Sequence, residues 1–327
     1  MLFDKQKNTL PVFTKEFYML GTIIRLKAYG YKGEDALREA FDKLIEIDDK
    51  MSVFKADSEI SKINYNSGYI TQKVSYDTFF VIKTAVKYSD MSKGAFEPTI
   101  RPIVDLWGIC TDHARIPHKK DISKKLELVN YKDIIFDKDK NTVMLNKENQ
   151  ALDLGGVAKG YAADKVKTIL AGNQIKSAII DLGGNIFAIG SKPDGESWSI
   201  GIQDPTRRRG ECIGSINIAN KSVVTSGNYE RYFMNEGRNF HHIIDPKTGY
   251  PSDNGIVSVT VISDCSIDGD ALSTCAYVMG LRRGIDFIES LEGIDAIFVT
   301  EDKEIFTTSG IKEDFRLFNK EFEYKTM

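Results

Sequence analysis

The sequence contains little cysteine and little histidine, with four residues of each among 327. The cysteines lie far apart and form no C-x-x-C pair, which excludes the common zinc and disulfide frameworks. They are Cys110, Cys212, Cys265 and Cys275. We expect free, packed thiols in a reducing compartment.

The sequence also lacks any run of 18 or more apolar residues, a lipid-attachment cysteine near the start, and a block of like charges. These absences predict an untargeted, cytoplasmic protein as the sequence stands. The alternative is an extracytoplasmic, membrane-anchored protein whose signal segment was removed before this numbering begins. The net charge of −3, from 44 basic and 47 acidic residues, predicts no binding of nucleic acid.

Short strands and amphipathic helices are present instead. Apolar residues at helical spacing predict a helix over 34–51, and strands dominate the second half of the chain. Other predicted helices are 76–90, 161–170 (with Gly172 just beyond its end), 271–278 and 283–291. Predicted strands are 17–29, 177–190, 197–203, 211–219, 222–226 and 256–262, with hairpins over 133–146 and 295–308. The pattern favours an α+β fold with mixed or antiparallel sheets and flanking helices. We expect a single domain over 1–327, with two interlocked lobes as the alternative organisation.

The segment 152–160 carries Asp153, then Gly155 and Gly156, then Lys159, before a helix that begins near Tyr161. Glycines allow a backbone to approach a ligand, and a helix start offers free N–H groups to a phosphate. Lys159 adds a positive charge. The alternative is a purely structural corner between a strand and a helix.

Asp270 and Thr274 are separated by four residues at the start of another predicted helix. If the helix begins at Asp270, their side chains share one face. A carboxylate and a hydroxyl placed in this way can bind a hard cation. The alternative is that Asp270 is an N-cap and Thr274 a buried hydroxyl.

His241 and His242 precede a turn that contains Pro246, Gly249 and Pro251. Prolines fix φ, so this turn is stiff and can hold a histidine in one geometry for acid/base or phosphate chemistry. A surface hairpin that happens to contain histidine is the alternative. The segment 94–108, with two prolines, Phe96, Glu97 and Trp107, suits the wall of a pocket for a flat ring. It could also be a loop anchored in the core by its aromatic residues.

Taken together and in order, these segments resemble the ApbE-type FAD:protein FMN transferases. The resemblance covers nearly the whole chain, and its motifs are Leu20-Gly21-Thr22, Met51-Ser52-Val53-Phe54 with Ser58 and Asn64, GAFEPT at 94–99 with LWG at 106–108, DLGGVAKGYAAD at 153–164, DLGGNIFAIG at 181–190, TSGNYERYF at 225–233, HHIIDPKTGYP at 241–251 and DALST at 270–274. Leu20 and Phe54 fall where the family usually has Met and often an aromatic with a polar tip, and Glu97 replaces the commoner Asp.

The resemblance implies a T-fold-like domain and a Mg²⁺-dependent transfer of FMN from FAD, with release of AMP. The acceptor would be a Thr or Ser hydroxyl of a partner flavoprotein, for example a subunit of a membrane redox complex. Carried over by position, the FAD contacts would be Leu20, Phe54, Ala95, Phe96, Glu97, Asp153, Lys159 and His242. The Mg²⁺ ligands would be the Gly156 carbonyl, Asp270 and Thr274.

Three functions compete at this point. The first is the transferase, the second is an FAD pyrophosphatase that yields free FMN and AMP, and the third is a non-enzymatic flavin-binding protein. The retained Asp153, Lys159, Asp270 and Thr274 argue against the third. A hydroxyl nucleophile needs a base. His242 and Asp270 are both candidates for this catalytic role, and His242 is preferred.

Overall fold

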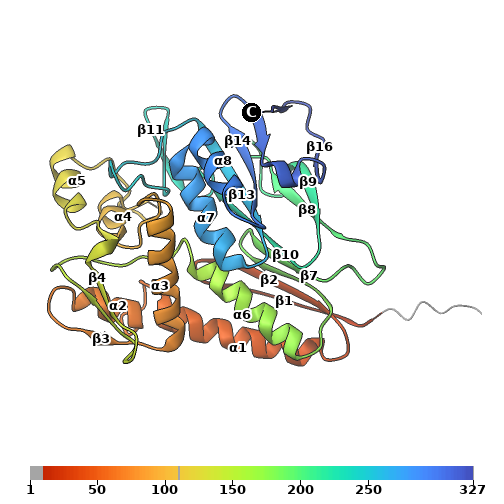
Figure 1. Cartoon of the computed structure of the whole chain (residues 1–327), viewed down its shortest axis with the longest axis horizontal. Coiled ribbons are helices and arrows are strands. Elements are labelled where there is room, and N and C mark those ends of the chain that lie inside the picture. The colour runs from red at the N-terminus through yellow and green to blue at the C-terminus, as the bar shows by residue number, and fades with distance from the viewer. Residues whose placement is uncertain (1–9, 110, 327) are drawn as a thin grey trace, which may run out of the picture.

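A computed structural model describes residues 10–109 and 111–326. Its centre is a nine-stranded sheet in which neighbouring strands are antiparallel, apart from the parallel pair of β15 and β17 (Figure 1). In spatial order the strands are β1 (Val12–Met19), β2 (Thr22–Tyr29), β6 (Ser177–Leu182), β7 (Asn185–Ile189), β10 (Lys221–Gly227), β13 (Ile256–Ser263), β14 (Asp295–Thr300), β15 (Glu304–Thr307) and β17 (Glu323–Tyr324).

Helices cover one face of this sheet (Figure 1). They are α1 (Gly33–Met51), α6 (Ala158–Gly172), α7 (Ser266–Met279) and α8 (Leu281–Glu289). Strand β2 shows why this face is apolar: Ile24, Leu26 and Ala28 alternate along it and are all buried in the main core. Helices α6 and α7 lie side by side on this core and contact each other.

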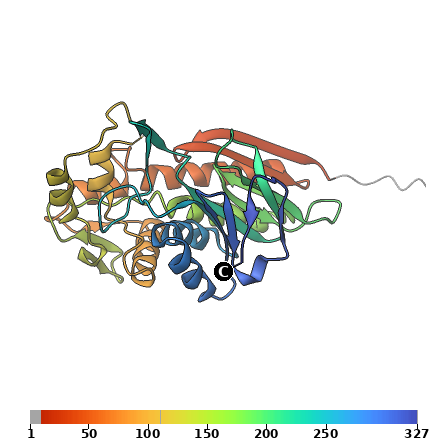
Figure 2. The same ribbon diagram turned by 90° about the horizontal axis from the view of Figure 1, so that it is seen from above.

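A smaller sheet packs on the opposite face of the large one and forms a second core with it. Its strands are β8 (Trp198–Gln203), β9 (Cys212–Ile218) and β16 (Phe315–Leu317). Isoleucines dominate this contact, as β-branched residues suit packed strand surfaces. The large sheet is therefore covered by helices on one face and, over part of its width, by strands on the other (Figure 2).

The remaining elements gather beside the ends of α6 and α7, at the left of Figure 1. They are α2 (Glu59–Tyr65), β3 (Gln72–Lys73), α3 (Tyr76–Met91), α4 (Arg101–Trp107), α5 (Lys119–Leu126), β4 (Ile134–Asp137), β5 (Thr142–Leu145), and the hairpin of β11 (Tyr232–Asn235) and β12 (Arg238–His241). Short 3₁₀ turns lie at Tyr131–Asp133 and Ser309–Ile311. Trp107 is fully buried here in a third, smaller core.

The predicted α+β class and both predicted hairpins are confirmed, but several boundaries are wrong. The predicted strands 17–29 and 177–190 are each interrupted by a two-residue turn, Leu20-Gly21 and Gly183-Gly184, in which all four residues have positive φ. Such turns join twisted antiparallel strands. The helix predicted from Tyr161 begins at Ala158, and Gly172 is its last residue rather than the residue after it.

The cysteines are only partly packed. Cys275 is buried and Cys212 is half-buried, but Cys265 is exposed, so the prediction of packing is wrong for Cys265. All three are free thiols, and Cys110 lies outside the described residues. In the described part of the chain no helix is both long and apolar enough to span a bilayer.

Candidate functional site

Asp270 lies in α7 where this helix crosses α6. The helices approach closely because Gly160 has no side chain: a Cβ there would lie 2.4 Å from the carbonyl oxygen of Ser266. Asp164 of α6 accepts hydrogen bonds from the backbone N–H groups of Ser266 and Ile267, both at 2.9 Å. Asp164 therefore caps the start of α7. The helix begins at Ser266, four residues earlier than supposed, so the interpretation of Asp270 as an N-cap is wrong.

The carboxylate of Asp270 is buried and faces α6. Its Oδ2 accepts a hydrogen bond from the backbone N–H of Gly160 at 2.9 Å, and its Oδ1 lies 3.3 Å from Nζ of Lys159. The same Nζ donates to the carbonyl oxygen of Gly155 at 2.8 Å. The first turn of α6 thus gives this buried negative charge a fixed N–H donor and a positive partner.

Further oxygen atoms gather beside this carboxylate. Thr274 lies one turn after Asp270, so both side chains are on the same face of α7. Oγ1 of Thr274 is 3.2 Å from Oγ of Ser226 in β10, and 3.6 Å from the position that a Cβ on Gly156 would take. The carboxylate and the hydroxyl of α7 therefore lie beside the backbone of the turn at Gly156.

This set of donors suits a hard cation rather than zinc. Within residues 10–109 and 111–326, no group of three or more His, Cys, Asp or Glu side chains could hold a metal ion by itself. Mg²⁺ needs few protein ligands, since substrate phosphates and water complete its shell. Asp270, Thr274 and the carbonyl of Gly156 fit a cation bound in this way.

The turn 153–156 is held from both sides. Nδ2 of Asn64 donates to the carbonyl oxygen of Leu152 at 3.0 Å, and its Oδ1 accepts from the N–H of the same residue at 2.7 Å. The N–H of Asp153 donates to the carbonyl oxygen of Pro98 at 2.8 Å. The motif residue Asn64 therefore works through the backbone, by fixing the position of the turn.

The glycines of this turn are needed for space. Neither Gly155 nor Gly156 has positive φ, but a Cβ on Gly156 would lie 3.0 Å from Cε2 of Phe96. Phe96 is buried, as is its neighbour Ala95. Ala95 and Phe96, the predicted wall, thus lie directly against the turn that precedes Lys159.

The start of α6 offers fewer free N–H groups than the sequence suggested. The N–H of Ala158 donates to the carbonyl oxygen of Leu154 at 2.8 Å, and that of Gly160 donates to Asp270. The prediction of a free helix start is therefore wrong for these two donors. The positive charge that a phosphate could meet here is mainly that of Lys159.

Arg101, at the start of α4, contacts three parts of this region. Its Nη1 lies 3.2 Å from Oδ2 of Asp153, and its Nη2 lies 2.7 Å from Oδ1 of Asp105. The guanidinium also lies over the ring of Phe54, 5.1 Å from the ring centroid. Phe54 is 82% exposed. An aromatic surface open to solvent, next to Asp153, could stack on a flat ligand ring.

Leu20 and Glu97 are placed differently from the other predicted contacts. Leu20 has φ 54° in the turn between β1 and β2, where it packs partly against the main core. The carboxylate of Glu97 accepts from the N–H and Oγ1 of Thr99, at 2.9 and 2.7 Å, and from the N–H of Tyr131 at 3.0 Å. Burial raises the pKa of this carboxyl. Glu97 braces its own loop, so a contact with FAD would use its backbone.

His241 is buried, and both of its ring nitrogens are used within the protein. Nε2 lies 3.1 Å from the carbonyl oxygen of Ser252, and Nδ1 lies 3.3 Å from the N–H of Ile243. Because a carbonyl oxygen only accepts, Nε2 carries the proton. Burial lowers the pKa of His241. This histidine holds the chain after β12 in place.

His242 is half-buried, and only one of its ring nitrogens is hydrogen-bonded to a described residue. Its Nδ1 lies 3.2 Å from the carbonyl oxygen of Arg231, so Nδ1 carries the proton and Nε2 keeps its lone pair. Across the described residues, no hydrogen bond to Nε2 is found. Burial lowers the pKa of His242 to about 3, and the charges of Arg231, His241 and Lys159 add to this effect. The ring is therefore neutral at pH 7.

The turn after His242 is braced by Trp107. The indole N–H donates to the carbonyl oxygen of Gly249 at 2.7 Å, and Gly249 has φ 72°. The N–H of Asp245 closes the turn onto the carbonyl oxygen of Tyr250 at 2.8 Å. Trp107 thus serves the core, as the alternative interpretation of 94–108 expected, and it stiffens the segment that carries His242. The segment is not wholly a loop, however, since Arg101–Trp107 form α4.

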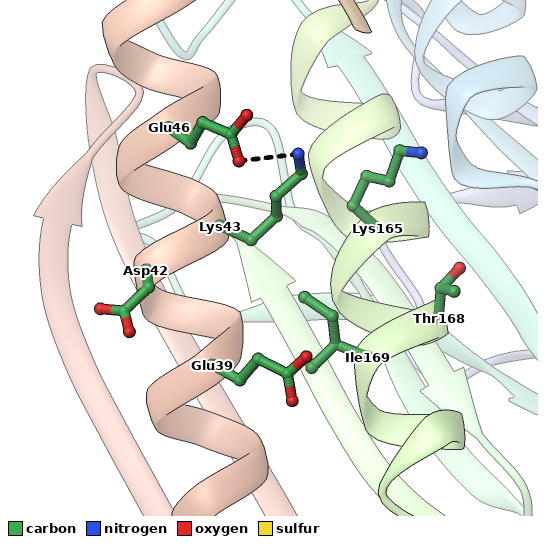
Figure 3. Close-up of a pocket in the computed structure, with 7 residues that line it drawn as sticks. All are labelled: Glu39, Asp42, Lys43, Glu46, Lys165, Thr168 and Ile169. Atoms are coloured by element: carbon green, nitrogen blue, oxygen red, sulfur yellow. Dashed lines mark hydrogen bonds and ion pairs between the residues drawn. The ribbon is translucent and has the colours of Figure 1, made fainter.

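A groove of about 400 Å³ between α1 and α6 is separate from this site (Figure 3). Its lining residues are Glu39, Asp42, Lys43, Glu46, Lys165, Thr168 and Ile169. Nζ of Lys43 lies 2.9 Å from Oε2 of Glu46. The groove lies over the second half of α6, whereas Lys159 is in its first turn, so we treat it as a packing feature of two helices.

Sequence reasoning gave no role to Arg101, Ser226 or Arg231. Each nevertheless lies in a segment that the sequence singled out, at 94–108 or 225–233. An arginine between Ile100 and Pro102, in an otherwise apolar run, was the one available signal. Apart from the i, i+4 ion pair of Arg101 with Asp105, the contacts of these residues are with neighbours distant in the sequence.

Comparison with known proteins gives a consistent result. The model of the ApbE family matches residues 20–298. Among curated proteins, the chain is 38% identical over 299 residues to an FAD:protein FMN transferase of Klebsiella pneumoniae, covering 91% of this chain and 92% of that protein. It is 31% identical over 327 residues to one of Treponema pallidum, covering 95% and 90%.

Solved structures agree with the sequence relatives. The ApbE protein of Thermotoga maritima superposes with a TM-score of 0.87 at 32% identity, covering 94% of this chain and 100% of that one. The flavin transferase ApbE of Vibrio cholerae gives a TM-score of 0.82 at 27% identity, covering 93% and 99%.

Proposed function

This chain belongs to the ApbE family, and from that premise we propose that it is an FAD:protein FMN transferase. The substrates are FAD and an acceptor protein. The single observation that supports the proposal best is the convergence of Asp270, Lys159 and Thr274 beside the turn at Gly156. This is the arrangement of charge that cleavage of a pyrophosphate requires.

We propose that FAD lies along the turn 153–156, with its pyrophosphate near Lys159 and a ring against Phe54. Asp153 and Arg101 form the wall between these two positions. Asp270, Thr274 and the carbonyl of Gly156 would hold Mg²⁺. When bound, the metal would stabilise the negative charge that develops on the phosphate oxygens.

The proposed reaction is a displacement at the phosphorus of the FMN half of FAD. The hydroxyl oxygen of an acceptor Thr or Ser forms a bond to this phosphorus. The bond from phosphorus to the bridging oxygen breaks, and AMP leaves with that oxygen and the electron pair. The hydroxyl proton passes to a base.

We propose His242 as that base and Asp270 as a metal ligand. Both carboxylate oxygens of Asp270 are already engaged, by Lys159 and by the N–H of Gly160. Nε2 of His242 has a lone pair, and Nδ1–H on the carbonyl of Arg231 fixes the ring orientation. A positioned imidazole contributes about 10²–10⁴-fold to such a proton transfer.

The test is incubation of the protein with FAD, Mg²⁺ and the protein acceptor of the Klebsiella pneumoniae relative, prepared without flavin. We expect flavin fluorescence on the denatured acceptor band, together with AMP in solution. AMP without a fluorescent acceptor would instead support the FAD pyrophosphatase. If neither a fluorescent acceptor nor AMP is formed, both enzymatic functions are contradicted.

A further inference from the structure

Two arginines next to the turns at Leu20-Gly21 and Gly183-Gly184 have charges that no carboxylate of the described residues neutralises by an ion pair. The first is Arg209, the last of three arginines in the loop between β8 and β9. Arg207 is 2.7 Å from Glu321, whereas Arg209 has no ion pair within residues 10–109 and 111–326. Nη2 of Arg209 instead lies 3.9 Å from the position of a Cβ on Gly184.

The second is Arg231, which is exposed and also has no ion pair with a described residue. Its Nη2 donates to the carbonyl oxygen of Gly21 at 3.1 Å. Its own carbonyl oxygen accepts from His242. Arg231 therefore lies between the proposed base and the turn that joins β1 to β2.

The two glycine turns that these arginines contact are neighbours. Strand β2 pairs with β6 up to Ile24 and Leu182, next to both turns. A Cβ on Gly183 would clash with the side chain of Thr22, so the turns are packed together. Arg209 and Arg231, which we call the arginine rim, thus flank one continuous stretch of surface.

An exposed apolar pair continues this surface along the β1–β2 hairpin. Tyr18 and Ile23 are cross-strand partners and are 75% and 41% exposed. Side chains alternate along paired strands, so both lie on the sheet face that carries Ile179. Ile179 packs against the second core, which is the side of the β8–β9 loop. The β1–β2 hairpin and the β11–β12 hairpin run along the same edge of the molecule (Figure 2).

We propose that the arginine rim, with Tyr18 and Ile23, is the docking surface for the acceptor protein. The rim would bind a carboxylate in the acceptor segment that carries the reacting hydroxyl. This inference rests on the proposed transferase function. Exposed apolar residues next to unpaired cations are typical of protein interfaces, and a docked segment here would lie beside His242.

A second reason favours a protein partner over FAD itself. The positive charge proposed for the pyrophosphate is Lys159, which lies on α6 beside Asp270. The arginine rim is carried by other segments, with Arg209 between β8 and β9 and Arg231 between β10 and β11. Cations at the edge of an interface mainly increase association rate and specificity.

The test compares Arg209→Gln with Arg208→Gln, a matched control in the same exposed loop. Binding of the Klebsiella pneumoniae acceptor to immobilised protein is measured by biolayer interferometry, and FAD binding by calorimetry. We expect Arg209→Gln to raise the acceptor Kd about tenfold, as for the loss of one charge-assisted contact. FAD affinity and the Arg208→Gln variant should be unchanged, and added salt should reduce the difference.

An unchanged acceptor Kd in Arg209→Gln would overturn the proposal. Weakened FAD binding in this variant would also overturn it, because the rim would then belong to the FAD phosphate site. The acceptor Kd and the FAD affinity are both measured without catalysis. A wild-type protein that binds the acceptor through Arg209 but transfers no FMN would contradict the proposed function and leave the docking surface supported.

Discussion

Nζ of Lys159 lies 3.3 Å from Oδ1 of Asp270, across the contact of α6 and α7. The lysine belongs to the proposed phosphate site and the carboxylate to the proposed metal site. A single ion pair therefore joins the two, and Gly160 makes the contact possible by allowing the helices to approach.

Replacing Asp270 by Asn should abolish most of the Mg²⁺-dependent AMP release. The amide keeps an oxygen for the N–H of Gly160 but removes the negative charge that a cation needs. We expect a loss of at least about a hundredfold in turnover, with little change in melting temperature. Asp268→Asn is the control, since Asp268 lies in the same helix as Asp270 and accepts a hydrogen bond from the hydroxyl of Tyr88 in α3. Equal turnover in the two variants would return Asp270 to a structural role.

Replacing His242 by Gln should reduce turnover by about 10²–10⁴-fold, because it removes the proposed base. FAD affinity should change little. His241→Gln should instead lower the free energy of unfolding by about 1–3 kcal/mol, since it disturbs two buried hydrogen bonds. Steady-state kinetics and urea titration of both variants separate these effects. Normal turnover of His242→Gln would mean that the base lies elsewhere.

The pKa of His242, lowered to about 3 in the free protein, should rise when FAD binds. The negative pyrophosphate would offset the charges of Arg231 and Lys159, which now disfavour the imidazolium form. Without ligand the ring of His242 stays neutral at pH 7. With FAD bound, its pKa moves toward the ordinary value of histidine. NMR titration of the ring protons measures this shift. His241 is the internal control, because its pKa is lowered mainly by burial; a shift confined to His241 would contradict the assignment.

Replacing Arg101 by Gln should weaken FAD binding about 5- to 30-fold. The guanidinium orients Asp153 and covers one face of Phe54, and such contacts are together worth about 1–2 kcal/mol. Asp105→Asn removes only an exposed partner of Arg101 and should leave the FAD Kd unchanged. Calorimetry on both variants provides the comparison. If the FAD Kd is the same in Arg101→Gln and Asp105→Asn, the stack of Arg101 on Phe54 plays no part in FAD binding.

Replacing Gly160 by Ala should lower the free energy of unfolding by about 1–3 kcal/mol, because its Cβ would meet Ser266 at 2.4 Å. Gly172→Ala, at the open end of the same helix, has no atom within 4 Å of its Cβ. It should stabilise the protein by about 0.4–1 kcal/mol. Thermal unfolding of the pair tests the close crossing of α6 and α7, and a Gly160→Ala variant as stable as the wild-type protein would contradict it.

The sequence predicted those parts of the fold that depend on local pattern. The helix 34–51 and the hairpins at 133–146 and 295–308 follow from periodicity and turn residues, and they are observed. The hairpin turns at Leu20-Gly21 and Gly183-Gly184 were missed. Both interrupt apolar runs that read as single strands.

The candidate site depended more on tertiary contacts. The i, i+4 spacing of Asp270 and Thr274 was visible in the sequence, but the helix start was not, because its cap is Asp164 from another helix. The same holds for Arg101, whose contacts with Asp153 and Phe54 come from other segments of the chain. The carboxylate of Glu97 is engaged by Thr99, two residues along the chain, and by Tyr131, which only the fold brings near.

The most direct measurement of the central claim is the stoichiometry of transfer. The protein, FAD and Mg²⁺ are incubated with the flavin-free Klebsiella pneumoniae acceptor, and intact-mass spectrometry of the acceptor is compared with the AMP released. We expect one added FMN, less one water, for each AMP, and no addition with Asp270→Asn. AMP released without any gain in acceptor mass would contradict a transferase.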